Sequence, residues 1–591
     1  MIPDQKQPTS WKVSKFGDAA FALIILMSLV IVYSPSLRGG FLWDDDCWTT
    51  NIITLLQDLS GMAKFWLQPT ALQQYYPLTA TSFWIDYNLW GLWTTPYHLE
   101  NVILHGISAW LFWRLLRYLD VPGSWFAAMI FALHPLMVES VAWITERKNV
   151  LSLVLYLGAL IAYGRFCHFW SVRDPLHSTG EYADRHPRFA YLLALLLFLG
   201  AMLSKATAFS LPPVLLLICW WKRGRIRWRE DVVPTLPIFA IAIGFSFVTA
   251  YLEKNHVGAH GTDWDFSFPQ RFLVAGRVLW FYTAKLFWPS EFAFVYPRWN
   301  PDPTVAWQWL YPIGALCIIF GLIAASNRIG RGSAAAVLFF VGTLFPVLGF
   351  MNAYFMRYSF VSDHWAYLSS LSLIALAGAL AANGAERINN RVLRLLIPCA
   401  LLLLLAKLTW SRAHVYLDSE SLWRDTIRKN PDSWMPHVNM SKLLVEKGKF
   451  DEAEAESRTS LRLRPNDVHL LYNFANLLAR RGKIDEAIKY YRQALQLHPT
   501  EADVHFNLAT LLFKQRILDE SAFHFREAVR YKPDYPNAHY RLGMALSAQG
   551  RREEALRAFG EALSRNPGSA EIKAALYKLL AENYGFEGRS Q

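Results

Sequence analysis

Long apolar segments separated by short polar stretches fill the first two thirds of the chain. Windows of about 17 to 22 mostly apolar residues recur there, and a helix of this length crosses a hydrocarbon layer of roughly 30 Å. We expect eleven such spans, near residues 18–37, 97–118, 122–142, 149–166, 188–205, 208–222, 232–251, 305–326, 333–351, 364–384 and 392–410. The remaining residues carry an ordinary share of charged side chains. The pattern therefore predicts an all-α protein with a transmembrane domain, residues 1–411, followed by a soluble domain, residues 412–591.

A further apolar segment, residues 272–287, decides the predicted topology because it carries Arg277 and Lys285. Cytoplasmic loops are enriched in Lys and Arg. If this segment spans the membrane, the basic clusters fall on both sides of it. If the segment lies along the outer surface as an interfacial helix, every basic cluster from Lys222 onward falls on the cytoplasmic side. We therefore expect an interfacial helix here and a non-cytoplasmic location for everything after Trp410. We also expect the first apolar segment to be retained as an anchor, because no cleavage site follows it.

Prolines recur every 34 residues in the soluble domain, at Pro431, Pro465, Pro499, Pro533 and Pro567. This is the period of tetratricopeptide repeat (TPR) helix pairs, in which small residues let the helices approach, aromatic residues fill the seam and proline ends the second helix. The pattern predicts a half repeat over 419–431, four repeats over 434–567 and a capping helix. A solenoid of this kind has a concave surface, which favours a protein or peptide partner.

The composition agrees with a membrane protein. Of 591 residues, 53% are hydrophobic and 15% aromatic, and the formal net charge is +12. The basic residues of the apolar part fall in short clusters between spans, which is typical of cytoplasmic loops rather than of a nucleic-acid surface. The five cysteines form neither a disulfide framework nor a metal-binding spacing. We therefore expect a multi-pass protein in contact with membrane lipid and no nucleic-acid partner.

Three adjacent carboxylates, Asp44, Asp45 and Asp46, follow the first apolar segment. Carboxylates at a membrane surface repel one another and resist desolvation, so their presence favours a cation, a basic partner or a reaction to serve. A solvated acidic turn is the plain alternative. We expect no cofactor, but a divalent metal held by the triplet stays open, although no His or Cys cluster supports it.

Further acidic, basic and hydrogen-bonding residues collect near the outer ends of the predicted spans. Each has an ordinary structural explanation by itself, such as helix capping, snorkelling or an interfacial aromatic belt. Together they predict a pocket that places a carboxylate base beside cations suited to a phosphate. The candidates are Asp44, Asp45, His134, Glu139, Glu146, Arg147, Lys148, Lys205, Asp363 and His364.

Several motifs carry a resemblance to a known family. They are HPLMVESVAWITERKN at 134–149, Tyr-Pro-Leu-Thr at 76–79, Tyr-His-Leu-Glu-Asn at 97–101, Leu-Ser-Lys at 203–205 and Lys-Leu-Phe-Trp-Pro at 285–289. Over nearly its whole length, including the order of its domains, the chain resembles bacterial relatives of the transmembrane and TPR repeat-containing (TMTC) family. That family belongs to the GT-C superfamily of membrane glycosyltransferases and is akin to protein O-mannosyltransferases.

The resemblance implies a function. It implies transfer of a sugar from a polyprenyl phosphate to a protein hydroxyl, with inversion at the anomeric carbon and with the TPR domain recruiting the acceptor. We expect the site and the TPR domain to face the periplasm from a bacterial inner membrane. The family's paired acids match Asp44 and Asp45; we take Asp45 as the base, and Asp46 is an additional carboxylate.

The same resemblance implies how the donor is held. Arg147 and Lys148, flanked by Glu146, match the family's basic motif and would bind the lipid phosphate, which a planar guanidinium suits well. Lys205 is expected to be a second phosphate contact. Two departures are visible: Asn149 stands where the motif usually has Asp, and the dipeptide at 364–365 is His-Trp where relatives often have Arg-Tyr.

Two other functions agree with parts of the pattern. In one, the membrane domain only anchors a TPR scaffold for envelope or export assembly, although an anchor needs one or two spans rather than eleven. In the other, the same fold transfers a glycan to lipid or to another glycan. The TPR domain favours a protein acceptor over the second alternative.

Overall fold

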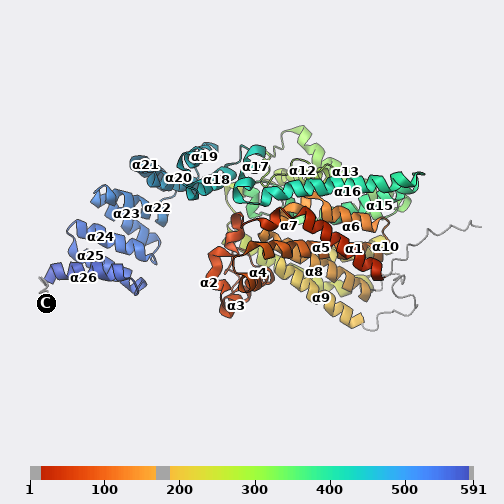
Figure 1. Ribbon diagram of the computed structural model, residues 1–591, viewed down its shortest axis with the longest axis horizontal. Helices are drawn as coiled ribbons and strands as arrows, with labels where there is room; N and C mark the ends of the chain where they lie inside the picture. The colour runs from red at the N-terminus through yellow and green to blue at the C-terminus, as the bar shows by residue number, and fades with distance from the viewer. Residues whose placement is uncertain (1–14, 168–186, 585–591) are drawn as a thin grey trace, which may run out of the picture. The chain divides into compact units, whose positions relative to one another are not determined.

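The computed structural model describes residues 15–167 and 187–584, and every regular element in these ranges is helical (Figure 1). The expected all-α fold is therefore confirmed. The chain divides into two compact units, Met1–Asn430 and Pro431–Gln591, which are described separately below.

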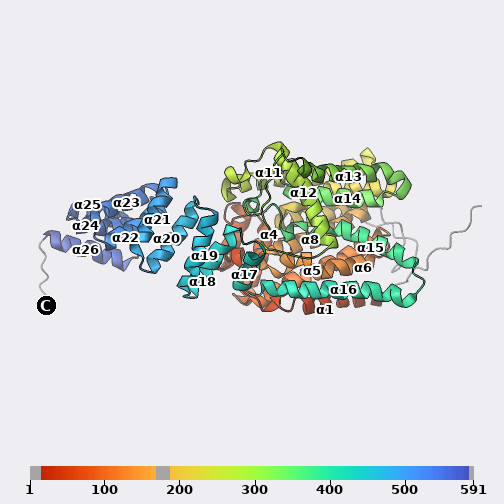
Figure 2. The ribbon, with the colours of Figure 1, turned by 90° about the horizontal axis from the view of Figure 1, so that it is seen from above.

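The first unit is a bundle of long helices in which α8 packs against both α9 and α5, and α5 packs against α1 (Figures 1 and 2). Three shorter helices, α2, α3 and α4, occupy the long segment between α1 and α5. The helices of this unit are α1 (Lys15–Val32), α2 (Ile53–Leu56), α3 (Leu59–Leu67), α4 (Pro77–Trp90), α5 (Thr94–Tyr118), α6 (Ser124–Leu133), α7 (Val138–Ala142), α8 (Arg147–Phe166), α9 (Pro187–Ser204), α10 (Leu211–Arg223), α11 (Leu236–Leu252), α12 (Phe268–Phe287), α13 (Leu310–Ile329), α14 (Gly332–Leu344), α15 (Ser370–Glu386), α16 (Arg391–Ala413) and α17 (Ser419–Lys429).

Five helical stretches of the described chain are long and apolar enough to cross a membrane: Ile144–Phe166, Pro187–Ser204, Trp228–Val257, Ala306–Ile329 and Arg391–Tyr416. The pair α6 and α7 passes the same test as one span with a bend of 52°. Shorter apolar helices occupy three more of the expected spans. The protein is thus a membrane protein, and the number of eleven spans stays a prediction.

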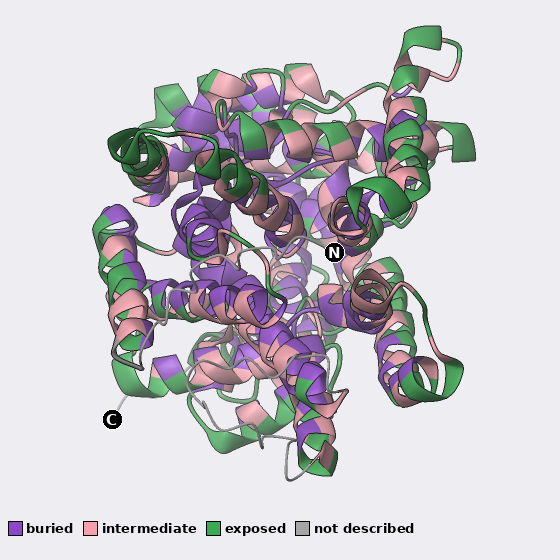
Figure 3. Cartoon of the chain, turned by 90° about the vertical axis from the view of Figure 1, so that its right-hand side faces the viewer, coloured by how far each residue is buried: buried purple, intermediate pink, exposed green. Residues whose placement is uncertain are grey.

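The pattern of buried and exposed residues agrees with a membrane domain. The helices at the centre of the first unit are buried along most of their length, and the outer ones expose broad faces (Figure 3). On α16, Leu395 and Leu403 are 66% and 71% exposed. Large apolar side chains that water would meet at high cost are what a lipid-facing helix carries.

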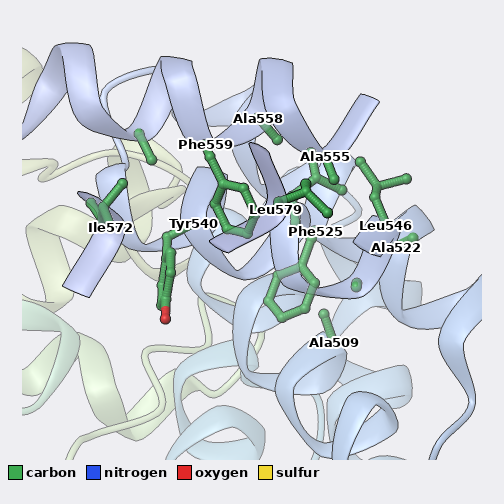
Figure 4. Close-up of a cluster of buried hydrophobic side chains, with 13 residues drawn as sticks. Ala509, Ala522, Phe525, Tyr540, Leu546, Ala555, Ala558, Phe559, Ile572 and Leu579 are labelled. Carbon is green, nitrogen blue, oxygen red and sulfur yellow. The ribbon is translucent and has the colours of Figure 1, made fainter. Parts of the chain in front are cut away.

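The second unit consists of four consecutive helix pairs and a terminal helix. The pairs are α18 (Trp434–Glu446) with α19 (Phe450–Leu463), α20 (Val468–Arg480) with α21 (Ile484–Leu497), α22 (Ala502–Lys514) with α23 (Leu518–Tyr531), and α24 (Pro536–Ala548) with α25 (Arg552–Arg565); α26 (Ala570–Tyr584) follows. Each second helix ends two residues before one of the recurring prolines. Small and aromatic side chains alternate in the seams, as in the cluster around Phe525 and Phe559 (Figure 4).

The helix that the sequence assigns to a half repeat, α17, groups with the first unit. Its Asp425 carboxylate pairs with Arg412 of α16 at 2.8 Å. Lys429 Nζ donates to the Phe292 carbonyl at 2.6 Å, and the next side chain, Asn430, donates to another carbonyl of the same loop. The boundary between the two units therefore follows Asn430, about twenty residues beyond the expected boundary, because the polar side chains of α17 pair within the first unit.

Candidate functional site

The acidic triplet lies in a short 3-10 turn, Trp43–Cys47, in the segment that follows α1. Its three carboxylates have different surroundings. Asp46 is exposed and accepts a hydrogen bond from Thr50 Oγ1 at 2.7 Å. Asp45 is buried, and Asp44 is half-buried. The tight turn therefore separates three neighbouring side chains into three environments.

Asp45 joins two segments of the chain. Its Oδ2 accepts the Leu42 N–H at 2.7 Å, while Oδ1 accepts the Thr145 N–H at 2.7 Å and also the Thr145 hydroxyl. Both carboxyl oxygens are thus occupied. Burial, together with the neighbouring carboxyl of Asp44, raises the pKa of Asp45 to about 8. A carboxyl with no vacant oxygen and a raised pKa is suited to anchoring the turn.

Asp44 keeps an unused oxygen. Its Oδ1 is buried and has no hydrogen-bond partner in the part of the chain that the structure describes. Burial raises the pKa of Asp44 to about 6, with the positive charge of Lys148 acting in the opposite direction. Within the pair, Asp44 therefore releases its proton before Asp45 does.

The residue that precedes these acids has a strained backbone. Trp43 has a φ of 44°, a left-handed conformation that costs a bulky residue on the order of 1–3 kcal/mol. Its ring stacks on Trp143 with centroids 5.7 Å apart and meets the rings of Phe294 and Trp423 edge-on. Aromatic packing from three separate segments holds Trp43 in place, and the left-handed residue sets the direction in which Asp44 leaves the turn.

A polar cluster surrounds Glu146, at the start of α8, and consists of Glu146, Lys148, Asn149, Lys205 and His364. Lys148 Nζ lies 3.0 Å from Glu146 Oε1, outside hydrogen-bond geometry, and Lys205 Nζ donates to Oε2 at 3.2 Å. Asn149 Nδ2 donates to Oε2 at 2.5 Å, and His364 Nε2 is 3.9 Å from Oε1. Two ammonium groups and one imidazole therefore share one buried carboxylate.

Glu139 holds the other side of the His364 ring. Glu139 Oε1 lies 2.5 Å from His364 Nδ1 and accepts the Ser362 hydroxyl at 2.7 Å. The neighbouring carboxyl, Asp363, points elsewhere and accepts the Tyr296 hydroxyl at 2.6 Å. Burial, reinforced by the charge of Glu139, raises the pKa of Asp363 to about 7. His364 is thus oriented between two glutamates, and Asp363 braces the loop behind it.

Arg147 lies away from this cluster, contrary to the role in phosphate binding that the resemblance implies. Its guanidinium is completely buried, and each of its three nitrogens donates a hydrogen bond. The acceptors are Asn101 Oδ1 at 2.8 Å, Asp86 Oδ2 at 2.5 Å, Glu100 Oε2 at 2.6 Å and the Tyr97 carbonyl at 2.8 Å. A phosphate reaching Arg147 would have to displace two carboxylates, so this side chain instead ties α4 and α5 to the start of α8.

His134 is also occupied by backbone groups. Its Nδ1 accepts the Leu136 N–H at 3.2 Å, which leaves Nε2 as the protonated nitrogen, 3.0 Å from the Leu286 carbonyl. This neutral imidazole joins the bend between α6 and α7 to the end of α12. The geometry assigns it a structural task rather than contact with a substrate.

Family models for the tetratricopeptide repeat match residues 438–502, 472–537 and 512–579. The expected repeats of the second unit are therefore confirmed. Among solved structures, YrrB, described as a TPR protein with an unusual peptide-binding site, is 22% identical over 28% of this chain and 85% of its own, with a TM-score of 0.26.

Curated relatives extend the comparison to the membrane part. A protein O-mannosyl-transferase of Caenorhabditis elegans is 24% identical over 459 residues, 73% of this chain and 61% of that relative. Protein O-mannosyl-transferase TMTC1 of Homo sapiens is 25% identical over 514 residues, 77% of this chain and 56% of its own. TMTC3 of Mus musculus is 32% identical over 165 residues, 25% of this chain and 17% of its own.

This chain is similar in sequence to the TMTC protein O-mannosyl-transferases. The resemblance seen in the sequence motifs is thus confirmed. The matches span at most 61% of the length of these three relatives.

The sequence analysis missed several residues that shape the site. Thr145 donates both its backbone N–H and its hydroxyl to Asp45 Oδ1, yet it lies inside the run 134–149 on which the resemblance rests. Trp43 and Ser362 each directly precede a candidate acid, but a hydrophobic or small residue beside an acid is no signal by itself. Their tasks become visible only when segments distant in sequence come together.

The arrangement can carry out one kind of chemistry. A half-buried carboxylate with a vacant oxygen lies within the electrostatic reach of Lys148, Glu146 and His364. Burial lowers the pKa of the second ammonium, Lys205, to about 8. In the described residues, no group of three or more His, Cys, Asp or Glu side chains is spaced to hold a metal ion. The site offers a proton acceptor near Lys148 and a second cation, Lys205, on the same glutamate, which suits displacement at a carbon that bears a phosphate.

Proposed function

We propose that this protein is an integral membrane glycosyltransferase that moves a sugar from a polyprenyl phosphate to a protein hydroxyl. The similar TMTC proteins are named as O-mannosyl-transferases, which favours mannose as that sugar. The reaction takes place on the non-cytoplasmic side. The single observation that carries the proposal is the vacant Oδ1 of Asp44, which lies within the electrostatic reach of Lys148, one of two ammonium groups that converge on Glu146.

The two ammonium groups serve the donor. Lys148 and Lys205 pair with one glutamate, so a phosphate that enters beside them meets cations that are only partly compensated. As the bond from the anomeric carbon to the phosphate oxygen breaks, the polyprenyl phosphate keeps the bonding electrons, and these two cations stabilise its negative charge. The planar Arg147 contributes indirectly, by fixing the helix end from which Lys148 projects.

Asp44 serves the acceptor. The acceptor oxygen attacks the anomeric carbon from the face opposite the phosphate, a new C–O bond forms, and the hydroxyl proton passes to Asp44 Oδ1. In-line displacement inverts the configuration. We assign the base to Asp44 instead of Asp45 because Asp45 spends both oxygens on the backbone turn and Thr145, and because it keeps its proton to about pH 8.

Three single substitutions in purified protein test this proposal: Asp44→Asn, Asp45→Asn and Asp46→Asn. With a polyprenyl-phosphate sugar and an acceptor peptide, we expect Asp44→Asn to lower kcat at least a hundredfold with little change in donor binding, because an amide of the same shape cannot accept the proton. Asp46→Asn is the matched control and should keep full activity, since its carboxylate is exposed.

Asp45→Asn is expected to lower thermal stability. The amide nitrogen of Asn replaces one of the two carboxyl oxygens and cannot accept a hydrogen bond, so the bond from Leu42 or those from Thr145 are lost. Loss of activity in Asp45→Asn alone, at unchanged stability, would move the base by one residue and keep the reaction. Full activity in all three variants would overturn the enzymatic proposal in favour of a membrane-anchored TPR scaffold.

A further inference from the structure

One face of α17 is buried in the first unit, next to the segment that carries the acids. The helix follows α16 after a short turn (Figure 1). Its buried residues are Leu422, Trp423, Asp425 and Thr426. This spacing puts them on one side of a helix. Trp423, which is 2% exposed, has the largest side chain on that side.

Trp423 contacts the residue that precedes the acids. Its ring meets the Trp43 ring edge-on, with centroids 6.4 Å apart, and the Phe294 ring lies 5.5 Å from Trp43 and 5.6 Å from Trp423. Trp43 has the left-handed φ of 44°, which a bulky residue keeps only when its surroundings hold it there. Trp423 closes one side of that packing, so its removal opens a space into which Trp43 can relax.

The chain on both sides of Trp423 holds the same region by hydrogen bonds. At the end of α17, Lys429 Nζ and Asn430 Nδ2 donate to backbone carbonyls on either side of Phe294, at 2.6 Å and 3.1 Å. Just before α17, the Leu417 carbonyl accepts the Gly40 N–H at 3.2 Å. This stretch therefore contacts the segment of the acids at its backbone, at its leading tryptophan and through the loop of Phe294.

We infer that Trp423 is a positioning residue for sugar transfer: by holding Trp43 in place, it keeps the Asp44 carboxyl turned inward, with its vacant Oδ1 buried. Trp423 acts through Trp43 rather than on the substrate. A helix that the proline spacing assigns to the repeats thus completes the site of the first unit. That the held carboxylate is the base rests on the proposed function, whereas the bracing of the turn by α17 does not.

The test uses the full-length protein in lipid nanodiscs, with a polyprenyl-phosphate sugar and an acceptor peptide. Trp423→Leu stays apolar but removes the ring that meets Trp43, so Asp44 is less well placed and kcat should fall roughly tenfold. The KM for the donor should change little, because the two cations assigned to the donor are held by Glu146 and not by α17. Trp423→Phe keeps a ring edge and should restore most of the rate.

Trp410→Leu is the matched control. Trp410 lies on α16, is 46% exposed and meets the His414 ring edge-on, so the same substitution there should leave transfer unchanged. Phe294→Leu is a second variant for the same prediction, because it removes the other ring that contacts both Trp43 and Trp423. It should lower kcat as Trp423→Leu does.

The pH profile separates positioning from a general loss of stability. Burial raises the pKa of Asp44 to about 6, and the charged groups that face it, Lys148, Glu146 and His364, lie on elements other than α17. A carboxyl released from burial has a pKa nearer to about 4. In Trp423→Leu the acidic limb of kcat should therefore move from about pH 6 toward about pH 4. A protein that is only less stable keeps the limb of its folded fraction unchanged.

A second readout does not depend on sugar transfer. Cys47 ends the turn that carries the acids and is half-buried, so its rate of modification by N-ethylmaleimide reports how firmly the turn is held. Peptide mass spectrometry should show severalfold faster labelling of Cys47 in Trp423→Leu and no change in Trp410→Leu. Cys219 of α10 is buried and should stay unlabelled in every folded variant.

Wild-type kcat and wild-type labelling of Cys47 in Trp423→Leu would overturn the inference. A lower rate with an unshifted acidic limb and unchanged labelling would also overturn it, because Trp423 would then be an ordinary core residue. If Asp44→Asn keeps full transfer, the proposed base fails, and faster labelling of Cys47 in Trp423→Leu would still establish that α17 braces the turn. Transfer that Asp44→Asn abolishes and Trp423→Leu leaves at full rate would instead keep the proposed function and count against Trp423.

Discussion

Asp44 and Asp45 are adjacent, yet the structure gives them different surroundings: Asp45 accepts two hydrogen bonds from Thr145, whereas Asp44 lies within the electrostatic reach of Lys148, Glu146 and His364. Two carboxyl groups at this separation do not ionise independently. The more deeply buried one, Asp45, holds the proton, and its neighbour carries the charge. A buried acid with a raised pKa therefore keeps the adjacent base ionised at neutral pH.

This division predicts the pH dependence of transfer. The base must be ionised, and the pKa of Asp44 is raised to about 6, so kcat should fall about tenfold per pH unit below pH 6 rather than below pH 4, as for an ordinary aspartate. Lys205, with a pKa lowered to about 8, loses its charge above that pH, so the KM for the donor should rise there. Initial rates from pH 5 to about pH 9 check both limbs.

Lys205→Arg is the control, because a guanidinium keeps its charge throughout this range. It should remove the alkaline rise in KM and leave the acidic limb in place. An acidic limb near pH 4 would show that the base is not Asp44.

At the residue scale the sequence named most of the residues that the structure brings together around Glu146 and Asp44, but not which of them pair with one another. The acids at 44 and 45 and the cations at 148 and 205 were predicted, since charged residues beside apolar spans are rare and usually functional. The role of Arg147 was not predictable, because its partners Asp86 and Glu100 lie 61 and 47 residues away. Which carboxylate a buried cation meets is decided by tertiary packing.

At the scale of elements, the TPR unit depends on close approach of its paired helices. A Cβ added to Gly543 of α24 would lie 2.7 Å from the Phe559 ring of α25, closer than van der Waals contact allows. That ring belongs to a buried cluster and has little room to move (Figure 4). By contrast, a Cβ at Gly560, on the exposed side of α25, meets nothing within 4 Å.

These two glycines form a matched pair for a stability test. Alanine favours a helix over glycine by roughly 1 kcal/mol, so Gly560→Ala should raise the melting temperature of the TPR unit. Gly543→Ala makes the same gain but overpacks the seam at a cost of roughly 1–3 kcal/mol, so it should lower that temperature. Thermal denaturation followed by circular dichroism measures both. A rise in both variants would contradict the tight seam.

The elements were largely predictable where a local pattern sets them. The 34-residue spacing of proline locates every repeat, because proline ends a helix regardless of its surroundings. The assignment of α17 to the TPR domain follows the same spacing, yet Asp425 and Lys429 take partners in the first unit. The residue at which a helix ends is set by the local sequence, whereas the unit with which the helix packs is set by tertiary contacts.

At the scale of the whole molecule, the first unit has two chemically different ends. Away from the acidic turn, Lys222 Nζ donates to the carbonyl of Leu119 that ends α5, and Arg223 Nη2 donates to that of Cys167 after α8. Basic side chains that bind the carbonyl ends of helices are favoured by the helix dipole. This basic end has the composition of a cytoplasmic face, so we expect the polar cluster on the opposite side of the membrane.

The last prediction concerns topology and turns on α12. Between the basic loop at 223–229 and the end of α16 we expect five spans, an odd number, so that a reporter in that loop and a reporter after residue 417 lie on opposite sides of the membrane. If α12 also crosses, there are six spans and both reporters lie on one side. Green fluorescent protein, which fluoresces only in the cytoplasm, should glow when fused within 223–229, and alkaline phosphatase, active only outside, should be active after residue 417. Fluorescence at both positions would make α12 a span and move the TPR unit to the cytoplasm. In that case the TPR unit would have no access to an acceptor on the outer face, and recruitment of the acceptor by the repeats would fail. The chemistry around Asp44 would still be tested by the same substitutions.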